Sequence, residues 1–222
     1  MRRYLPFAIV AAVALVTVAA GTILYRANRM TARDLSPSDM PKAADGGETM
    51  HVLGPANAPV TLEEFGDFQC PPCGKLAEPI RDLAKEFGPK LRVIFREQPL
   101  PVHVHAREAA SAAEAAGLQG KFWAMHELLY REQASWTAAA DARPLFSSYA
   151  GILGLNLDRF RQDIDSAAVK ARVDADKARA TAVGATATPT IFVNGHQITG
   201  TSLSVAGLRS AIQEAASVAT KN

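Results

Sequence analysis

The sequence predicts an α/β fold in which a long helical segment separates two groups of strands. Three observations support this prediction. Residues 59–65 and 91–100 have the apolar pattern of strands, and residues 74–88 between them repeat apolar side chains at helical spacing. Residues 103–183 then contain several helical segments in succession. Beyond residue 184 the period of the apolar pattern returns to two, so the predicted order is β-α-β, a helical insert and β-β-α.

The first group reads as a strand, a helix and a second strand. In residues 59–65 alternation places Val60, Leu62 and Glu64 on one face of the strand. The helix of residues 74–88 is amphipathic, and a Gly-Pro pair stops it. A strand, a helix and a strand in this order imply a parallel crossover unit.

The second group reads as a hairpin followed by a helix. Two short apolar segments flank Asn194 and Gly195, and an Asn-Gly pair supplies the positive φ angles of a type I′ turn. Residues 203–216 then form an amphipathic pattern with the apolar side chains on one face. We therefore expect a two-residue hairpin and a closing helix.

The N-terminus differs from the rest of the chain. Arg2 and Arg3 precede an uncharged run over residues 5–25, and roughly 20 apolar residues suffice to span a bilayer. The run is longer than the core of a typical signal peptide, which has about 7–15 residues. We expect residues 1–29 to be an uncleaved signal anchor in a membrane, with a cleaved signal peptide as the alternative. Residues 30–50 have the composition of a flexible linker.

The only two cysteines, Cys70 and Cys73, lie at the predicted junction of strand and helix. The free N–H groups and the dipole at a helix start favour a thiolate, so Cys70 is the expected nucleophile and Cys73 the resolving thiol. A structural disulfide across so small a loop would add little stability, and a zinc site would require two further ligands. We expect a redox pair; a zinc site completed by histidines and an idle or structural pair remain alternatives.

The two residues between the cysteines, Pro71 and Pro72, fit the first turn of a helix, where a missing N–H leaves no bond unmade. Pro72 offers no N–H to the Cys70 sulfur, and neither position carries a histidine. Fewer donors predict a less stabilised Cys70 thiolate, and hence a less oxidising pair than one with a histidine between the cysteines.

The segments EEFGDFQCPPC and TATPTIFVNGHQITG, with the helical insert between them, resemble the DsbA-like branch of the thioredoxin superfamily. The resemblance covers about residues 51–217. It implies that residues 51–102 and 184–219 form a thioredoxin-like domain and that residues 103–183 form an inserted helical domain. The Pro-Pro dipeptide departs from DsbA itself, which has a histidine at the second position.

The resemblance also implies roles for individual residues. Thr188-Pro189 matches the cis-proline that faces the cysteine pair, which leaves the Thr188 backbone free to bind a substrate peptide as an added strand. Glu64 matches an acidic residue that accepts the Cys73 proton, provided that it is buried. The alternative is a slipped register in which Glu63 or Glu64 is simply solvated.

The resemblance further implies an apolar substrate groove around the cysteine pair. Phe68 is the candidate for its wall, and Pro71 is expected at its mouth. No metal and no organic cofactor are implied. No long basic stripe is present, so nothing indicates nucleic-acid binding.

Together these features predict an extracytoplasmic thiol-disulfide oxidoreductase, in the periplasm or at the outer face of the cell membrane. It would exchange the Cys70–Cys73 disulfide with cysteines of protein substrates and would promote disulfide formation. An unidentified redox partner would reset the pair. A thiol reductase of the same fold and a membrane-tethered peptide-binding module with non-catalytic thiols are the alternatives. An isomerase is a weaker hypothesis because no dimerisation segment is visible.

Overall fold

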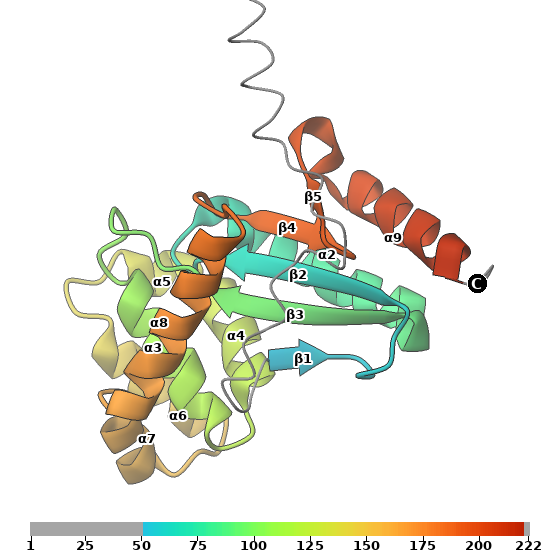
Figure 1. Cartoon of the computed structure of the whole chain (residues 1–222). Helices are drawn as coiled ribbons and strands as arrows, with labels where there is room; N and C mark the ends of the chain where they lie inside the picture. The colour runs from blue at the N-terminus through green and yellow to red at the C-terminus, as the bar shows by residue number, and fades with distance from the viewer. Residues whose placement is uncertain (1–50, 220–222) are drawn as a thin grey trace, which may run out of the picture. The chain divides into compact units, whose positions relative to one another are not determined.

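The computed structural model describes residues 51–219. The centre of this part is a five-stranded mixed sheet with strand order β1-β3-β2-β4-β5 (Figure 1). Strands β2 and β3 are parallel, and the other neighbouring strands are antiparallel. The strands are β1 (His51–Leu53), β2 (Val60–Gly66), β3 (Leu91–Glu97), β4 (Thr190–Val193) and β5 (His196–Ile198).

Helices cover both faces of the sheet. On one face, apolar residues of α2 and α9 pack with those of β2, β3 and β4. On the other face α8 packs against Phe65 of β2 and Phe192 of β4, and Figure 1 shows α8 and α2 on opposite sides of the sheet. The α-helices are α2 (Pro71–Phe87), α3 (Ala106–Gly117), α4 (Phe122–Arg131), α5 (Gln133–Thr137), α6 (Arg143–Ile152), α7 (Leu157–Asp163), α8 (Ala167–Ala182) and α9 (Val205–Ala219).

The helices between β3 and β4 form a second core. Helix α3 has buried alanines on nearly all of its faces. Their small side chains let α4, α6, α7 and α8 pack closely against α3. Trp136, Phe146 and Phe160 are among the largest fully buried side chains of this core. The aromatic side chains Phe68 and Phe95 join the same cluster from the sheet side, so the insert packs directly beneath the loop that carries the cysteines.

The predicted order of elements is confirmed, with two local differences. Strand β1 was not predicted, because three residues are too few to show a period, and it adds an antiparallel edge to β3. Helix α2 begins at Pro71, three residues before the apolar pattern but where the two prolines were expected, and it continues through Pro79. The predicted Asn-Gly turn is confirmed, since Asn194 and Gly195 have φ angles of 46° and 84°.

The expected signal anchor at residues 1–29 and the expected linker at residues 30–50 lie outside the described residues. Across residues 51–219, none of the helices combines the length and the apolar character that a membrane span requires.

Candidate active site

Cys70 occupies the N-cap position of α2, directly after the loop that follows β2. Its φ and ψ angles of −75° and 118° are extended, and Pro71 and Pro72 open the helix behind it. The Gly74 N–H donates to the Cys70 carbonyl oxygen at 3.2 Å, which closes the first turn. Both prolines are exposed, whereas Cys70 is 5% and Cys73 0% exposed. The cysteine at the helix start is therefore the one beside the surface.

Thr188 and Pro189, which are remote in sequence, lie against Cys70. The peptide bond between them is cis. The Cys70 thiol donates to the Thr188 carbonyl oxygen, with 3.4 Å between Sγ and O. Both Thr188 and Pro189 are partly exposed beside the start of β4. The structure thus brings together the two segments that carry the resemblance.

Glu64 lies in β2 on the face that packs against α2, and it is 2% exposed. Its Oε1 has no hydrogen-bond partner within the described part of the chain. Glu63 is also buried, but on the opposite face, where it accepts hydrogen bonds from Arg96 and Arg179 at 3.0 and 2.7 Å. The alternative of a solvated carboxylate at either position is therefore wrong, and the predicted alternation of the strand is correct.

The two thiols have opposite pKa shifts. The pKa of Cys70 is lowered to about 6, chiefly because Cys73 hydrogen bonds to its sulfur, and burial opposes this effect. The same hydrogen bond, together with burial, raises the pKa of Cys73 far above its usual range. Burial raises the pKa of Glu64 to about 8, and the charge of Cys70 adds to this shift. Near pH 7 the site therefore holds a Cys70 thiolate, a Cys73 thiol and a protonated Glu64.

Phe68 does not line a substrate groove, contrary to the expectation from sequence. Its side chain is 1% exposed and stacks on Phe95 with 5.3 Å between ring centroids. It also contacts the rings of His126 and Tyr130 of α4. The loop turns this side chain inward because the insert offers an aromatic cluster directly beneath it. Phe68 therefore supports the cysteine loop from below.

Comparison with known proteins identifies the family. A family model described as Thioredoxin matches residues 47–214, about three quarters of the chain. The chain belongs to the thioredoxin family. Among solved structures, a thioredoxin-like oxidoreductase from Silicibacter pomeroyi DSS-3 is 28% identical, with a TM-score of 0.63, and the match covers 74% of this chain and 90% of that one. BdbD from Bacillus subtilis is 25% identical, with a TM-score of 0.66 and coverage of 75% and 92%.

The chain is thus similar in fold and sequence to solved oxidoreductases of the thioredoxin family. Among curated proteins, the Na(+)/H(+) antiporter NhaA 1 of Salinispora arenicola is 41% identical over 167 residues, which are 74% of this chain and 24% of that protein. The NhaA of Herminiimonas arsenicoxydans is 42% identical over 153 residues, 69% of this chain and 24% of that protein. The chain thus spans about a quarter of the length of the curated relatives it matches.

Asp67 fixes the loop of this thioredoxin-family site, and sequence reasoning missed it. Its carboxylate is fully buried and accepts hydrogen bonds from the Gln69 N–H at 2.7 Å and the Leu100 N–H at 2.8 Å. The imidazole Nδ1 of His103 lies 2.7 Å from the same carboxylate. An Asp ahead of a turn was a local signal, since Asp often caps its own loop. Its partners beyond residue 97 had no local signal.

Gln133, at the start of α5, is a second residue that the sequence did not reveal. Its side-chain Nε2 donates to the carbonyl oxygens of Phe68 at 2.6 Å and Cys70 at 3.0 Å. The helical insert thereby holds both ends of the segment that leads into the cysteine pair.

The described residues show Cys70 and Cys73 as free thiols. Residues 51–219 contain no group of three or more His, Cys, Asp or Glu side chains arranged to hold a metal ion. What the arrangement offers chemically is a thiol of lowered pKa beside the surface, a second thiol of raised pKa one turn behind it and a buried carboxyl.

Proposed function

We propose that the protein exchanges disulfides with cysteines of other proteins through Cys70, outside the cytoplasm and mainly in the direction of disulfide formation. The observation that carries the proposal is the difference between the two thiols. Cys70 lies at the start of α2 with a lowered pKa, whereas Cys73 lies behind it with a raised pKa. A low-pKa thiol is both a nucleophile and a good leaving group near neutral pH.

In the oxidising direction, a substrate thiolate attacks the Cys70 sulfur of the Cys70–Cys73 disulfide. The disulfide breaks, Cys73 leaves and takes up a proton, and a mixed disulfide joins Cys70 to the substrate. A second substrate thiolate then attacks the substrate sulfur, and Cys70 leaves as a thiolate. Two electrons pass from the substrate dithiol to the enzyme. A redox partner removes them again and restores the Cys70–Cys73 disulfide.

In the reducing direction the Cys70 thiolate attacks a substrate disulfide, and Cys73 then releases the substrate. Cys73 must lose its proton for that step, and we propose Glu64 as the base. Burial is the main reason for the raised pKa of Glu64, and the Cys70 charge is the second. Formation of the mixed disulfide removes the Cys70 charge, so Glu64 ionises more readily when Cys73 needs a base.

A substrate peptide would bind beside Cys70 along the Thr188 backbone as an added strand, next to Pro189 and the exposed Pro71. In place of Phe68, we propose Val102 and Val104 as the apolar part of this surface. Their exposed fractions are 78% and 79%, which is unusual for valine. They flank His103, which binds Asp67 of the cysteine loop, so they lie close to the active site.

We propose that residues 5–25 anchor the protein in a membrane and that residues 51–219 act in the periplasm or at the outer face of the cell membrane. Disulfide formation belongs to such compartments. The similarity to segments of proteins named as Na(+)/H(+) antiporters agrees with a place at a membrane. Antiport itself is not part of the proposal, because the chain spans about a quarter of those proteins.

Trapping of the mixed disulfide tests this function against a peptide-binding module with non-catalytic thiols. A Cys73→Ser variant retains Cys70 but cannot resolve the intermediate, so it should accumulate disulfide-linked substrates in cells of a bacterial host. Cys70→Ser is the matched control and should trap none. Equal, reducible adducts of both variants, or none with either, would contradict the proposal. A redox equilibrium against glutathione then distinguishes an oxidase from a reductase, because the reductase would hold its disulfide at a lower potential.

A further inference from the structure

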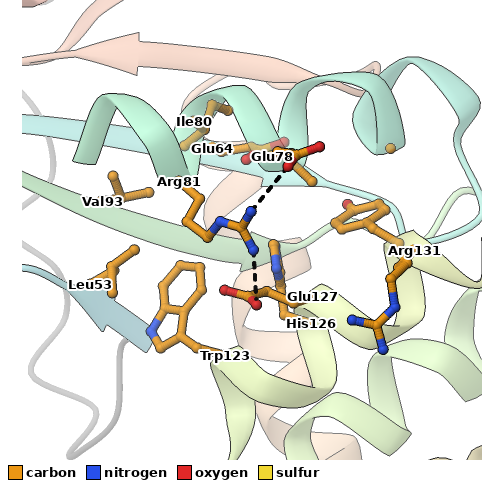
Figure 2. Close-up of a pocket in the computed structure, with 13 residues that line it drawn as sticks. Leu53, Glu64, Glu78, Ile80, Arg81, Val93, Trp123, His126, Glu127 and Arg131 are labelled. Atoms are coloured by element: carbon orange, nitrogen blue, oxygen red, sulfur yellow. Dashed lines mark hydrogen bonds and ion pairs between the residues drawn. The ribbon is translucent and has the colours of Figure 1, made fainter. Parts of the chain in front are cut away.

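A cavity of about 360 Å³ lies behind the cysteine pair, between α2 and α4. Figure 2 shows side chains of both helices pointing toward each other across it, with Glu64 beneath α2. Its lining includes Glu64 of β2, Ala77 and Arg81 of α2, and Trp123, His126 and Tyr130 of α4.

Besides Arg81, whose Nε also lacks a hydrogen-bond partner, four residues of this lining carry buried polar atoms that have no such partner among the described residues. These atoms are Glu64 Oε1, Trp123 Nε1, both ring nitrogens of His126 and the Tyr130 hydroxyl. Buried polar groups are rarely left without partners, so each of these atoms calls for one. A polar cavity of this volume has room for several waters with two or more partners each.

The four groups supply both donors and acceptors. The indole of Trp123 donates, and the Tyr130 hydroxyl can donate and accept. Burial lowers the pKa of His126 to about 3, so its neutral ring offers one donor and one acceptor. Burial is the main cause of the raised pKa of Tyr130, and the charges of Cys73 and Glu64 add to it, so its hydroxyl lies within electrostatic reach of the reacting groups. This set can bind a connected chain of water.

The outer end of the cavity is charged and reaches the surface. Arg81 of α2 crosses to α4, where its Nη1 lies 3.0 Å from Glu127 Oε2, and its Nη2 donates to Glu78 at 3.2 Å (Figure 2). The side chains of Glu127 and Arg131 are 44% and 66% exposed. The inner end of the cavity is Glu64. Its side chain is 2% exposed, so the carboxyl does not contact bulk solvent directly.

We propose that this cavity is the proton route of the active site, in which water bound by Tyr130, His126 and Trp123 carries protons between Glu64 and bulk solvent. The inference rests on the proposed role of Glu64 as the base for Cys73. The proposal gives the helical insert a role in proton transfer, because all three water-binding side chains belong to α4. A buried base must exchange its proton in every turnover, and the cavity joins it to the surface.

The resolving step shows what the route has to do. Once a substrate is disulfide-bonded to Cys70 and the Cys70 charge is gone, Glu64 ionises by giving its proton to cavity water. The Cys73 thiol then gives its proton to the Glu64 carboxylate, and its sulfur attacks Cys70. The mixed disulfide breaks, the Cys70–Cys73 disulfide forms and the substrate leaves as a thiolate. Glu64 then passes its proton to cavity water, the water chain releases one proton to solvent, and the carboxylate is restored. When the enzyme disulfide is reduced, the proton travels inward and ends on Cys73.

Two substitutions interrupt the route without altering the cysteines or Glu64. Tyr130→Phe deletes one hydroxyl and keeps the aromatic packing, and Ala77→Leu fills the cavity from α2. The measurement is the rate at which Cys73 releases glutathione from a Cys70–glutathione mixed disulfide, followed by stopped flow in H₂O and in D₂O. We expect both variants to release glutathione about tenfold more slowly and with a larger solvent isotope effect, since proton transfer becomes limiting. Tyr149→Phe, at a buried tyrosine of α6 outside this cavity, should release it at the wild-type rate.

A structural disturbance would also change the Cys70 thiolate, so its pKa and its rate of attack on glutathione disulfide are measured in each variant and should stay at wild-type values. Unchanged release by Tyr130→Phe and Ala77→Leu, or slowing that matches a shifted Cys70 pKa, would overturn the proton route. Wild-type protein that never releases glutathione through Cys73 would instead overturn the proposed function.

Discussion

The side-chain amide of Gln133 lies directly over the α-carbon of Gly74, the residue that follows the second cysteine. A Cβ at position 74 would stand 2.9 Å from Gln133 Oε1. From this place the amide donates to the carbonyl oxygens of Phe68 and Cys70. The helical insert therefore binds the cysteine loop through the Gln133 side-chain amide. This amide fits above Gly74 because residue 74 has no side chain.

Gly74→Ala should destabilise the protein by about 1–3 kcal/mol, because the added methyl forces the Gln133 amide away from its two acceptors. In a Gln133→Ala background the same change should become neutral or stabilising by up to about 1 kcal/mol, since alanine favours a helix over glycine. Urea unfolding of the four reduced proteins gives both values. An equal cost of Gly74→Ala in the two backgrounds would contradict the contact.

Gln133→Ala alone should cost about 1–3 kcal/mol, because it leaves two carbonyl oxygens of the loop with fewer donors. Gln119→Ala is the matched control. Gln119 also bonds the backbone twice, to Asn156, but at an exposed place where water replaces it. Its loss should cost less than about 1 kcal/mol in the same unfolding experiment. Equal losses of unfolding free energy in Gln133→Ala and Gln119→Ala would mean that the hydrogen bonds of Gln133 to the loop add no stability beyond those of an exposed amide.

Glu64→Gln should make the reduced protein more stable than wild type as the pH rises. The pKa of Glu64 is raised from 4.5 to about 8 in the folded protein, so the folded state holds this proton more tightly than the unfolded state. Wild type therefore loses stability between these values, by on the order of 5 kcal/mol, and the uncharged glutamine does not. The measurement is the free energy of unfolding of both proteins from pH 4 to pH 9.

Glu63→Gln is the control, and its pH dependence should have the opposite sign. Burial alone would raise the pKa of Glu63, but hydrogen bonds and charges of Arg179 and Arg96 outweigh burial and lower it. Its contribution to stability is present above the unfolded pKa and is lost as the pH falls through the folded pKa. Glu63→Gln should thus be most harmful at neutral pH and less so in acid. Parallel pH profiles for the two variants would contradict the opposite pKa shifts of Glu63 and Glu64.

Pro72→His should lower the pKa of Cys70 below its value of about 6 and make the enzyme disulfide more oxidising. The imidazole and the restored N–H both favour the thiolate. Pro72→Ala restores the N–H without the ring, so it should have a smaller effect in the same direction. Thiolate absorbance against pH and the glutathione equilibrium measure the two quantities. A Cys70 pKa that is unchanged in both variants would show that the dipeptide does not set it.

Much of the fold followed from local patterns. Alternation placed Glu64 on the α2 face, and Asn194-Gly195 closed the hairpin as predicted. The apolar period alone begins only after the cysteines, at residue 74, but the two prolines predicted the first helical turn directly after Cys70, where α2 begins. Short strand β1 had no period to detect.

Most contacts that support the cysteine loop could not be predicted from local sequence patterns. Gln133 lies 65 residues from Phe68 and 63 from Cys70, and an amide in a helical insert looks like any surface amide. Phe68 was expected to line a substrate groove because it lies beside the cysteines in sequence and the family resemblance implies an apolar groove there. Its burial depends on Phe95 and on rings of α4, which only the folded chain brings together.

The difference between the two thiols is the central claim, and alkylation against pH tests it most directly. Reduced protein is treated with iodoacetamide across a range of pH, and mass spectrometry reports the modification of each cysteine. We predict that Cys70 reacts with an apparent pKa near 6, well below the ordinary cysteine value of 9.0, and that Cys73 stays unmodified up to about pH 9. Reaction of Cys70 with a pKa near 9, or of Cys73 before Cys70, would contradict the account.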